Sequence, residues 1–137
     1  MKRKMINEEG IPAVVRENTD GSFSLIGCRC RHCGFVNFPA IRYCVSCSAD
    51  DTEEVELSKA GTLYTFTQTM RPVNHMPAGN ISSYVDLDDG ARILTPIDMP
   101  DGDLPVIGER FEIVFRPLWV EDDETEVFGF AARPMGR

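Results

Sequence analysis

Five cysteines between residues 28 and 47 limit the folds open to this chain more than any other feature of its sequence. Four of them form two Cys-x2-Cys units, Cys30 with Cys33 and Cys44 with Cys47, which ten residues separate. Each unit can direct two thiolates at one point, so the two units together supply a tetrahedral four-sulfur site. The spacing predicts a zinc ribbon whose structural Zn²⁺ has a closed coordination shell and no open position for catalysis.

Other interpretations of the cysteines stay open. The ribbon can lack its metal, or one Cys-x2-Cys unit can be a redox pair. A thioredoxin-like pair needs a long helix after it, however, and residues 34–43 show no helical periodicity. Cys28 could replace Cys30 as a ligand, but four residues would then separate it from Cys33, so we expect a strand residue there. We expect His32 to be a solvent-facing turn residue.

The length and the start of the chain bear on where the protein works. A chain of 137 residues can form one domain or two very small ones. It has no apolar run of the roughly 20 residues that a membrane helix needs, and its first ten residues lack the apolar core of a secretion signal. We therefore expect a cytoplasmic protein with no membrane contact, in a compartment where grouped cysteines indicate metal ligands or redox groups.

The rest of the chain has the composition of β-strands. Two short apolar runs flank Asp20-Gly21, a dipeptide typical of a tight hairpin, which leads into the first cysteine pair. After the polar stretch 48–61, five segments rich in Thr, Val, Ile, Phe and Tyr follow, at residues 62–70, 81–87, 91–97, 110–116 and 126–132. We expect a mainly β protein, a rubredoxin-like zinc ribbon followed by a five-stranded OB-fold barrel, with domains at residues 1–57 and 58–137.

Charge argues against one function that this architecture suggests. OB-folds often bind single-stranded nucleic acid in a positively charged groove. Residues 1–49 carry seven Lys or Arg against four acidic residues, whereas residues 50–137 carry seven against eighteen, a balance of −11. Such a barrel would repel phosphates, so we expect no nucleic-acid partner, although a single-strand-binding module remains an alternative. We expect the barrel aromatics in the core instead: Tyr64, Phe66, Tyr84, Phe111, Phe115, Phe128 and Phe130.

Three stretches together resemble a known family. They are GCRCRHCGFVNFPAIRYCVSC, LSKAGTLYTFT and YVDLDDGARIL, and the resemblance covers residues 24 to about 131. The chain is similar to the acyl-CoA-associated zinc-ribbon/OB-fold family, long filed as a domain of unknown function. Members share an aromatic-Pro segment, here Phe38-Pro39, between the cysteine pairs. This chain departs from them in Cys47-Ser48, where Cys-Gly is more usual, and in a short tail and hairpin instead of a long N-terminal helix.

The resemblance implies a non-catalytic role. Members are partners of thiolase-superfamily enzymes, which they stabilise or whose coenzyme A channel they complete. It implies a hetero-oligomer with a thiolase-like large subunit and a coenzyme A thioester shared with that subunit, in the thiolytic cleavage of a 3-oxoacyl-CoA. The chain's own residues agree, because His32 and His75 lie in different segments and no Ser or Cys stands in a recognisable nucleophile motif. A zinc- or redox-regulatory protein is the other alternative.

Two groups of residues are candidates for contacts within such a complex. Arg29, Arg31 and Arg42 flank the cysteine pairs, and arginine suits bidentate contacts to the phosphates of coenzyme A. They can equally be surface charges that offset the four thiolates. Met70, His75 and Met76 lie in residues 70–80 between the first two barrel strands, where a flexible apolar loop suits contacts with a partner or an acyl chain.

Overall fold

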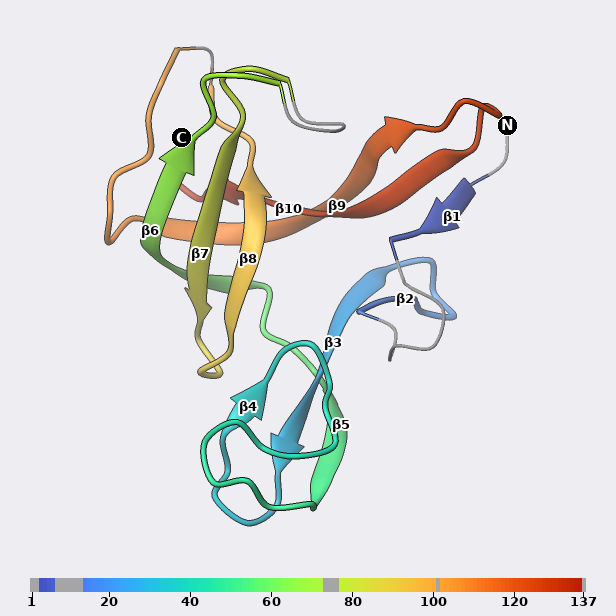
Figure 1. Ribbon diagram of the computed structural model, residues 1–137, viewed down its shortest axis with the longest axis vertical. Coiled ribbons are helices and arrows are strands. Elements are labelled where there is room, and N and C mark those ends of the chain that lie inside the picture. Colours follow the sequence, from blue (N-terminus) through green and yellow to red (C-terminus); the bar gives the residue numbers. More distant parts are fainter. Residues whose placement is uncertain (1–2, 7–13, 73–76, 101, 137) are drawn as a thin grey trace.

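The computed structural model describes residues 3–6, 14–72, 77–100 and 102–136. These residues form β-strands and no helix, and hence no helix that could cross a membrane. The strands are β1 (Arg3–Met5), β2 (Val15–Glu17), β3 (Phe23–Cys30), β4 (Val36–Asn37), β5 (Thr52–Glu56), β6 (Ala60–Gln68), β7 (Ile81–Leu87), β8 (Arg92–Ile97), β9 (Arg110–Val120) and β10 (Glu126–Pro134). Figure 1 shows β6 to β8 on one side of a barrel, the ribbon strands beneath them, and a β9–β10 hairpin that extends beyond the barrel.

Strands β6 to β10 close into a five-stranded barrel. They follow one another in the order β6-β7-β8-β10-β9, and β9 returns to β6 where Ala60–Thr62 pairs with Arg110–Glu112. All neighbours are antiparallel except β8 and β10, which are parallel through Ile97 and Ala132. This is the strand order of an OB-fold, so the predicted barrel is confirmed, and each of the five predicted segments overlaps one of its strands.

The ribbon is built around β3, which pairs with three other strands. β2 and β3 form the predicted hairpin, whose turn places Gly21 at a positive φ of 87°, a conformation that glycine adopts without steric cost. The second half of β3 pairs with β4 and β5, so that the chain segment carrying the cysteine pairs begins and ends beside one strand. The expected mainly β ribbon is therefore present.

Aromatic side chains join the ribbon to the barrel. Phe23 of β3 packs against Phe128 and Phe115, with ring centroids 4.6 and 5.8 Å apart. Phe38 meets Phe130 edge-on at 6.0 Å. Buried side chains of both parts belong to one core, in which Val15, Leu25, Val36 and Leu57 of the ribbon join barrel residues such as Leu63, Val85 and Phe111. The domain boundary that we expect after residue 57 stays a prediction.

The expected burial of the barrel aromatics is wrong at two positions. Phe111 and Phe128 are buried, but Tyr64 and Tyr84 are 52% and 43% exposed. A β-bulge between Leu63 and Thr65 turns Tyr64 outward, since a bulge changes the alternation of side chains. Tyr84 shares the outer face of β7 with residues 82 and 86, whereas Ile81, Ser83, Val85 and Leu87 point into the barrel.

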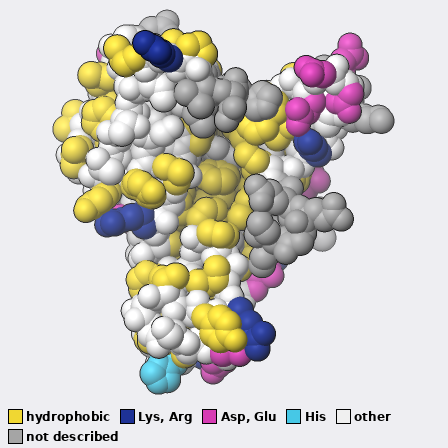
Figure 2. Space-filling view, viewed as in Figure 1, with side chains coloured by type: hydrophobic (Ala, Val, Ile, Leu, Met, Phe, Trp, Pro, Cys, Tyr) yellow, Lys and Arg dark blue, Asp and Glu magenta, His cyan; other side chains and the backbone are white. Residues whose placement is uncertain are grey.

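Charged side chains are unevenly distributed over the molecule. The β9–β10 hairpin ends in the acidic residues 121–124, and acidic side chains gather there in Figure 2. Hydrophobic side chains lie over β6, β7 and β8 and over the adjoining part of the ribbon. The barrel thus has a face that differs in chemistry from the acidic end of the molecule.

Candidate metal centre

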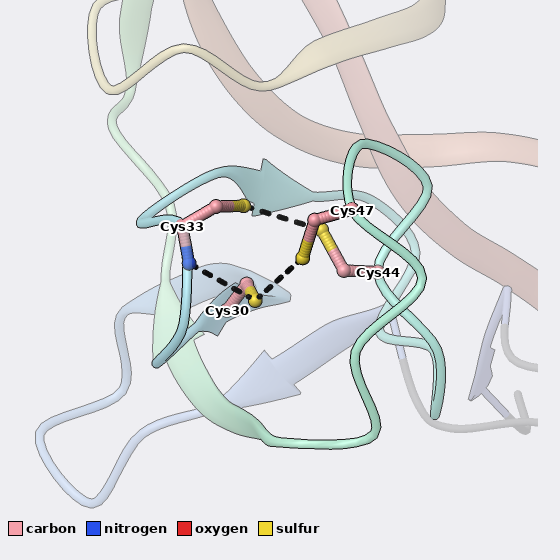
Figure 3. A group of neighbouring side chains, drawn as sticks. All are labelled: Cys30, Cys33, Cys44 and Cys47. Atoms are coloured by element: carbon pink, nitrogen blue, oxygen red, sulfur yellow. Dashed lines mark hydrogen bonds between the residues drawn. The ribbon is translucent and has the colours of Figure 1, made fainter.

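The four predicted ligands lie together at the end of the ribbon. Cys30 Sγ and Cys47 Sγ are 3.6 Å apart, as are Cys33 Sγ and Cys44 Sγ, and all four sulfurs lie within 4.8 Å of one another (Figure 3). A tetrahedral Zn²⁺ with bonds of about 2.3 Å places its sulfurs about 3.8 Å apart. The donor set and its spacing therefore fit zinc, and the four cysteines form a zinc-ribbon-type metal site.

Backbone hydrogen bonds give the two cysteine turns the same conformation. The amide of Gly34 donates to the Cys30 carbonyl over 2.9 Å, and the amide of Ser48 donates to the Cys44 carbonyl over 2.8 Å. Both residues have a positive φ, 81° for Gly34 and 65° for Ser48. Ser48 thus takes the left-handed conformation that glycine takes in the first turn. The departure from Cys-Gly changes the residue but keeps the geometry.

Asn37 connects the buried side of the site to β4. Its side chain is only 3% exposed, its Nδ2 donates to Cys44 Sγ over 3.7 Å, and its Oδ1 accepts from the Val45 amide over 3.2 Å. The spacing of the cysteines does not predict a role for this residue. An Asn immediately before the aromatic-Pro segment is the one signal that could have indicated a polar group beside the cysteines.

The pKa values of the thiols differ across the site. Burial works to raise the pKa of Cys44, but the amides of Cys47, Ser46 and Asn37 outweigh it and lower that pKa to about 6. The backbone amide of Ala49 lowers the pKa of Cys47. Burial and the neighbouring thiols outweigh this effect and raise the pKa to about 12. The amide of Cys33 lowers the pKa of Cys30. Thiolates crowded in this way favour a bound cation, because it stabilises the charges that they impose on one another.

Cys28 and His32 lie outside the four-sulfur group. Cys28 is buried, and its Sγ donates to the carbonyl of Ile41 and accepts from the amide of the same residue, at 3.5 and 3.4 Å. It therefore fixes the loop between the cysteine pairs. Its place on β3 agrees with the expected strand residue. His32 is exposed in the first turn, as expected.

The three arginines beside the site differ in their ion pairing. Arg31 contacts Asp51 at 3.1 Å and Glu53 at 3.6 Å, and Arg42 contacts Asp50 at 3.0 Å. Arg29 is exposed on β3 and makes no ion pair with any residue in the described part of the chain. Contact of these side chains with coenzyme A stays a prediction. Met70 is 82% exposed, while His75 and Met76 lie outside the described residues.

The fold and the site together define a class of protein, the four-cysteine zinc ribbons that continue into an OB-fold barrel. Residues 22–53 match the family model described as the rubredoxin-like zinc ribbon domain of ChsH2, and residues 54–116 match the model of its C-terminal OB-fold domain. A DUF35 domain-containing scaffold protein of Methanocaldococcus jannaschii is 33% identical over 118 residues, which are 82% of this chain and 83% of that protein. The chain belongs to the DUF35 family of zinc ribbon/OB-fold proteins.

Two further relatives bear on function and on fold. A protein of Thauera aromatica named benzoylsuccinyl-CoA thiolase subunit BbsA is 30% identical over 92 residues, which are 66% of this chain and 64% of that subunit. The solved structure titled Ltp2-ChsH2(DUF35) aldolase has a TM-score of 0.61 and 23% identity over 81% of this chain and 84% of the other. The structural likeness supports the fold. The family matches confirm the resemblance that the sequence suggests. The relatives include a protein named as a thiolase subunit.

Proposed function

We propose that this chain is a non-catalytic accessory subunit of a thiolase-superfamily acyl-CoA enzyme in the cytoplasm. The observation that carries the proposal is its similarity to a protein named as a thiolase subunit, joined to a metal site that is closed by four cysteines. Four thiolates leave Zn²⁺ no open position for water or substrate, so the metal holds the ribbon together and takes no part in chemistry. The nucleophile and the base of a thiolase reaction come from the large subunit.

The names of the same relatives support a proposal for the reaction. Two proteins, from Thauera aromatica and Geobacter metallireducens, carry the name benzoylsuccinyl-CoA thiolase subunit BbsA. We propose thiolytic cleavage of a 3-oxoacyl-CoA by the large subunit, in the degradation of an aromatic compound, with this chain in the position of the small subunit. Its role is to stabilise the large subunit and to form part of the coenzyme A channel.

The contact with coenzyme A has one well-placed candidate. Arg29 is exposed and makes no ion pair with a described residue, whereas Arg31 and Arg42 already contact carboxylates. In the assembled complex, replacing all three by Ala should weaken coenzyme A binding, measured by titration calorimetry. Arg133→Ala is the matched control, since Arg133 is an exposed arginine that pairs with Glu112 on the barrel. Equal affinity in both variants would remove the arginines from the channel.

The proposed function is tested by isolating the native complex. A tag on this chain, expressed from its own locus, should recover a thiolase-like large subunit that mass spectrometry identifies. The recovered complex should cleave a 3-oxoacyl-CoA, and the tagged chain alone should not. Recovery of no acyl-CoA enzyme, or of single-stranded nucleic acid instead, would overturn the proposal.

A further inference from the structure

The outer face of β6, β7 and β8 carries large apolar side chains that the barrel core does not use. Tyr64, Tyr84 and Leu94 are 52%, 43% and 58% exposed. Tyr84 and Leu94 are direct cross-strand neighbours, and Thr65, next to Tyr64, is the partner of Tyr84 on the other side. The three side chains thus lie on adjacent strands of one sheet face. We name this surface, with the adjoining ribbon residues Phe35 and Val45, the aromatic face.

Arg92 joins the barrel part of the aromatic face to the ribbon part. Its guanidinium lies 3.7 Å from the centre of the Tyr64 ring. The same side chain lines a cleft of about 320 Å³ whose other walls are ribbon residues, among them Phe35, Phe38 and Val45. Val45 is 71% exposed at the rim of this cleft. Figure 2 shows hydrophobic side chains over both the barrel and the ribbon, and Arg92 with the cleft that it lines connects the two parts of the aromatic face.

The charged groups of the aromatic face neutralise one another. Arg92 donates to both carboxylate oxygens of Asp86, at 2.6 and 3.1 Å. At the edge of the face, Arg110 donates to both oxygens of Asp88 at 2.7 Å. The whole chain has a net charge of −8, so a large face without unbalanced charge stands out from the rest of the surface. Such a face can be covered without burying an unpaired charge.

We propose that the aromatic face is the docking surface for the large catalytic subunit, and that it receives an uncharged apolar surface of that subunit. This inference rests on the proposed function. Charge favours this occupant over the others. Nucleic acid requires unpaired basic groups, and both arginines here are paired. A second copy of this chain would bring together two molecules of net charge −8. Exposed tyrosines beside an arginine are typical of the residues that anchor protein interfaces.

The test compares matched acidic substitutions in the full-length tagged chain. Leu94→Glu and Tyr84→Glu place a carboxylate in the aromatic face, where docking would bury it without a partner. Val120→Glu is the control, because Val120 is 53% exposed on the hairpin of β9 and β10, away from this face. We expect the first two variants to bind the large subunit recovered with the wild type at least about tenfold more weakly, and the control to bind like the wild type.

Each outcome decides a different point. Circular dichroism and a zinc content of one per chain show that the variants are folded. If the wild type recovers a thiolase-like subunit and Leu94→Glu retains it, the aromatic face is not the docking surface, and the proposed function stands. If the wild type recovers no such subunit, the proposed function fails together with this occupant. If Leu94→Glu instead converts a dimer of the isolated chain into a monomer in sedimentation, the occupant is a second copy and the inference is overturned.

Discussion

At the scale of single residues, Asn37 has the clearest effect on the metal site. Its amide donates to Cys44 Sγ and its oxygen accepts from the Val45 amide, so it fixes one ligand and the turn that carries it. Groups that hydrogen-bond to a ligand typically change metal affinity by about 10–100-fold. We predict that Asn37→Leu releases zinc to a chromogenic chelator about tenfold faster than the wild type. Thr52→Val is the control, because Thr52 donates to the Ile41 carbonyl and to no sulfur. Equal release rates in the two variants would contradict the prediction.

A substitution at Ser48 should stabilise the ribbon, whereas the change at Asn37 weakens its metal site. It adopts a φ of 65°, which crowds the Cβ of an L-residue and costs about 1–2 kcal/mol. Ser48→Gly removes that strain but gives the unfolded chain more freedom, so we predict a net gain of about 0.5–1 kcal/mol in the free energy of unfolding. Ser46→Gly, two residues earlier in the same turn, has no such strain to lose and should be destabilised. Urea denaturation of the zinc-loaded variants measures both, and a loss in Ser48→Gly would show that the serine is not strained.

At the scale of elements, Gly27 allows β4 to pass close to β3. A Cβ at this position would collide with the carbonyl oxygen of Asn37 and lie 2.9 Å from a methyl group of the buried Leu57. We predict that Gly27→Ala lowers the free energy of unfolding by about 1–3 kcal/mol, as overpacking of a core does. Gly136→Ala should leave it unchanged, since nothing lies within 4 Å of its Cβ and its φ is not positive. Similar urea midpoints for the two variants would mean that β4 can move aside.

The elements also show how much the sequence could predict. The spacing of the cysteines and the β-type composition of the barrel segments depend on local chemistry, and both predict the right elements. β5 and β1 were missed for a different reason. β5 has the sequence TEEVE and is a strand because it pairs with β3, and β1 pairs in parallel with β10, more than 120 residues away. The distant partner of β1 leaves no local signal in the sequence, and the three acidic residues of β5 give it the composition of a loop. The bulge that exposes Tyr64 interrupts the alternation itself, so the pattern placed that ring in the core.

At the scale of the whole molecule, the ribbon and the barrel depend on each other. Phe23 stands on the strand that leads into the metal site, and it packs on Phe128 of β10 and Phe115 of β9. Arg3 of β1 lies over Phe128 as well, with 4.9 Å between the guanidinium carbon and the ring centre. One core runs through both parts of the molecule. The loss of metal from the ribbon should therefore also lower the stability of the β9–β10 hairpin.

The single tryptophan allows this coupling to be measured. Trp119 lies on β9 opposite Val127, the residue that precedes Phe128 in β10, and it is far along the chain from the cysteines. A structural zinc contributes many kcal/mol to folding, so we predict that EDTA lowers the midpoint of thermal unfolding seen by Trp119 fluorescence by at least about 10 °C. EDTA already saturated with zinc is the control and should leave the midpoint in place. A Trp119 transition that stays unchanged while the ribbon loses its structure by circular dichroism would mean that the aromatic contacts of Phe23 do not couple the two parts.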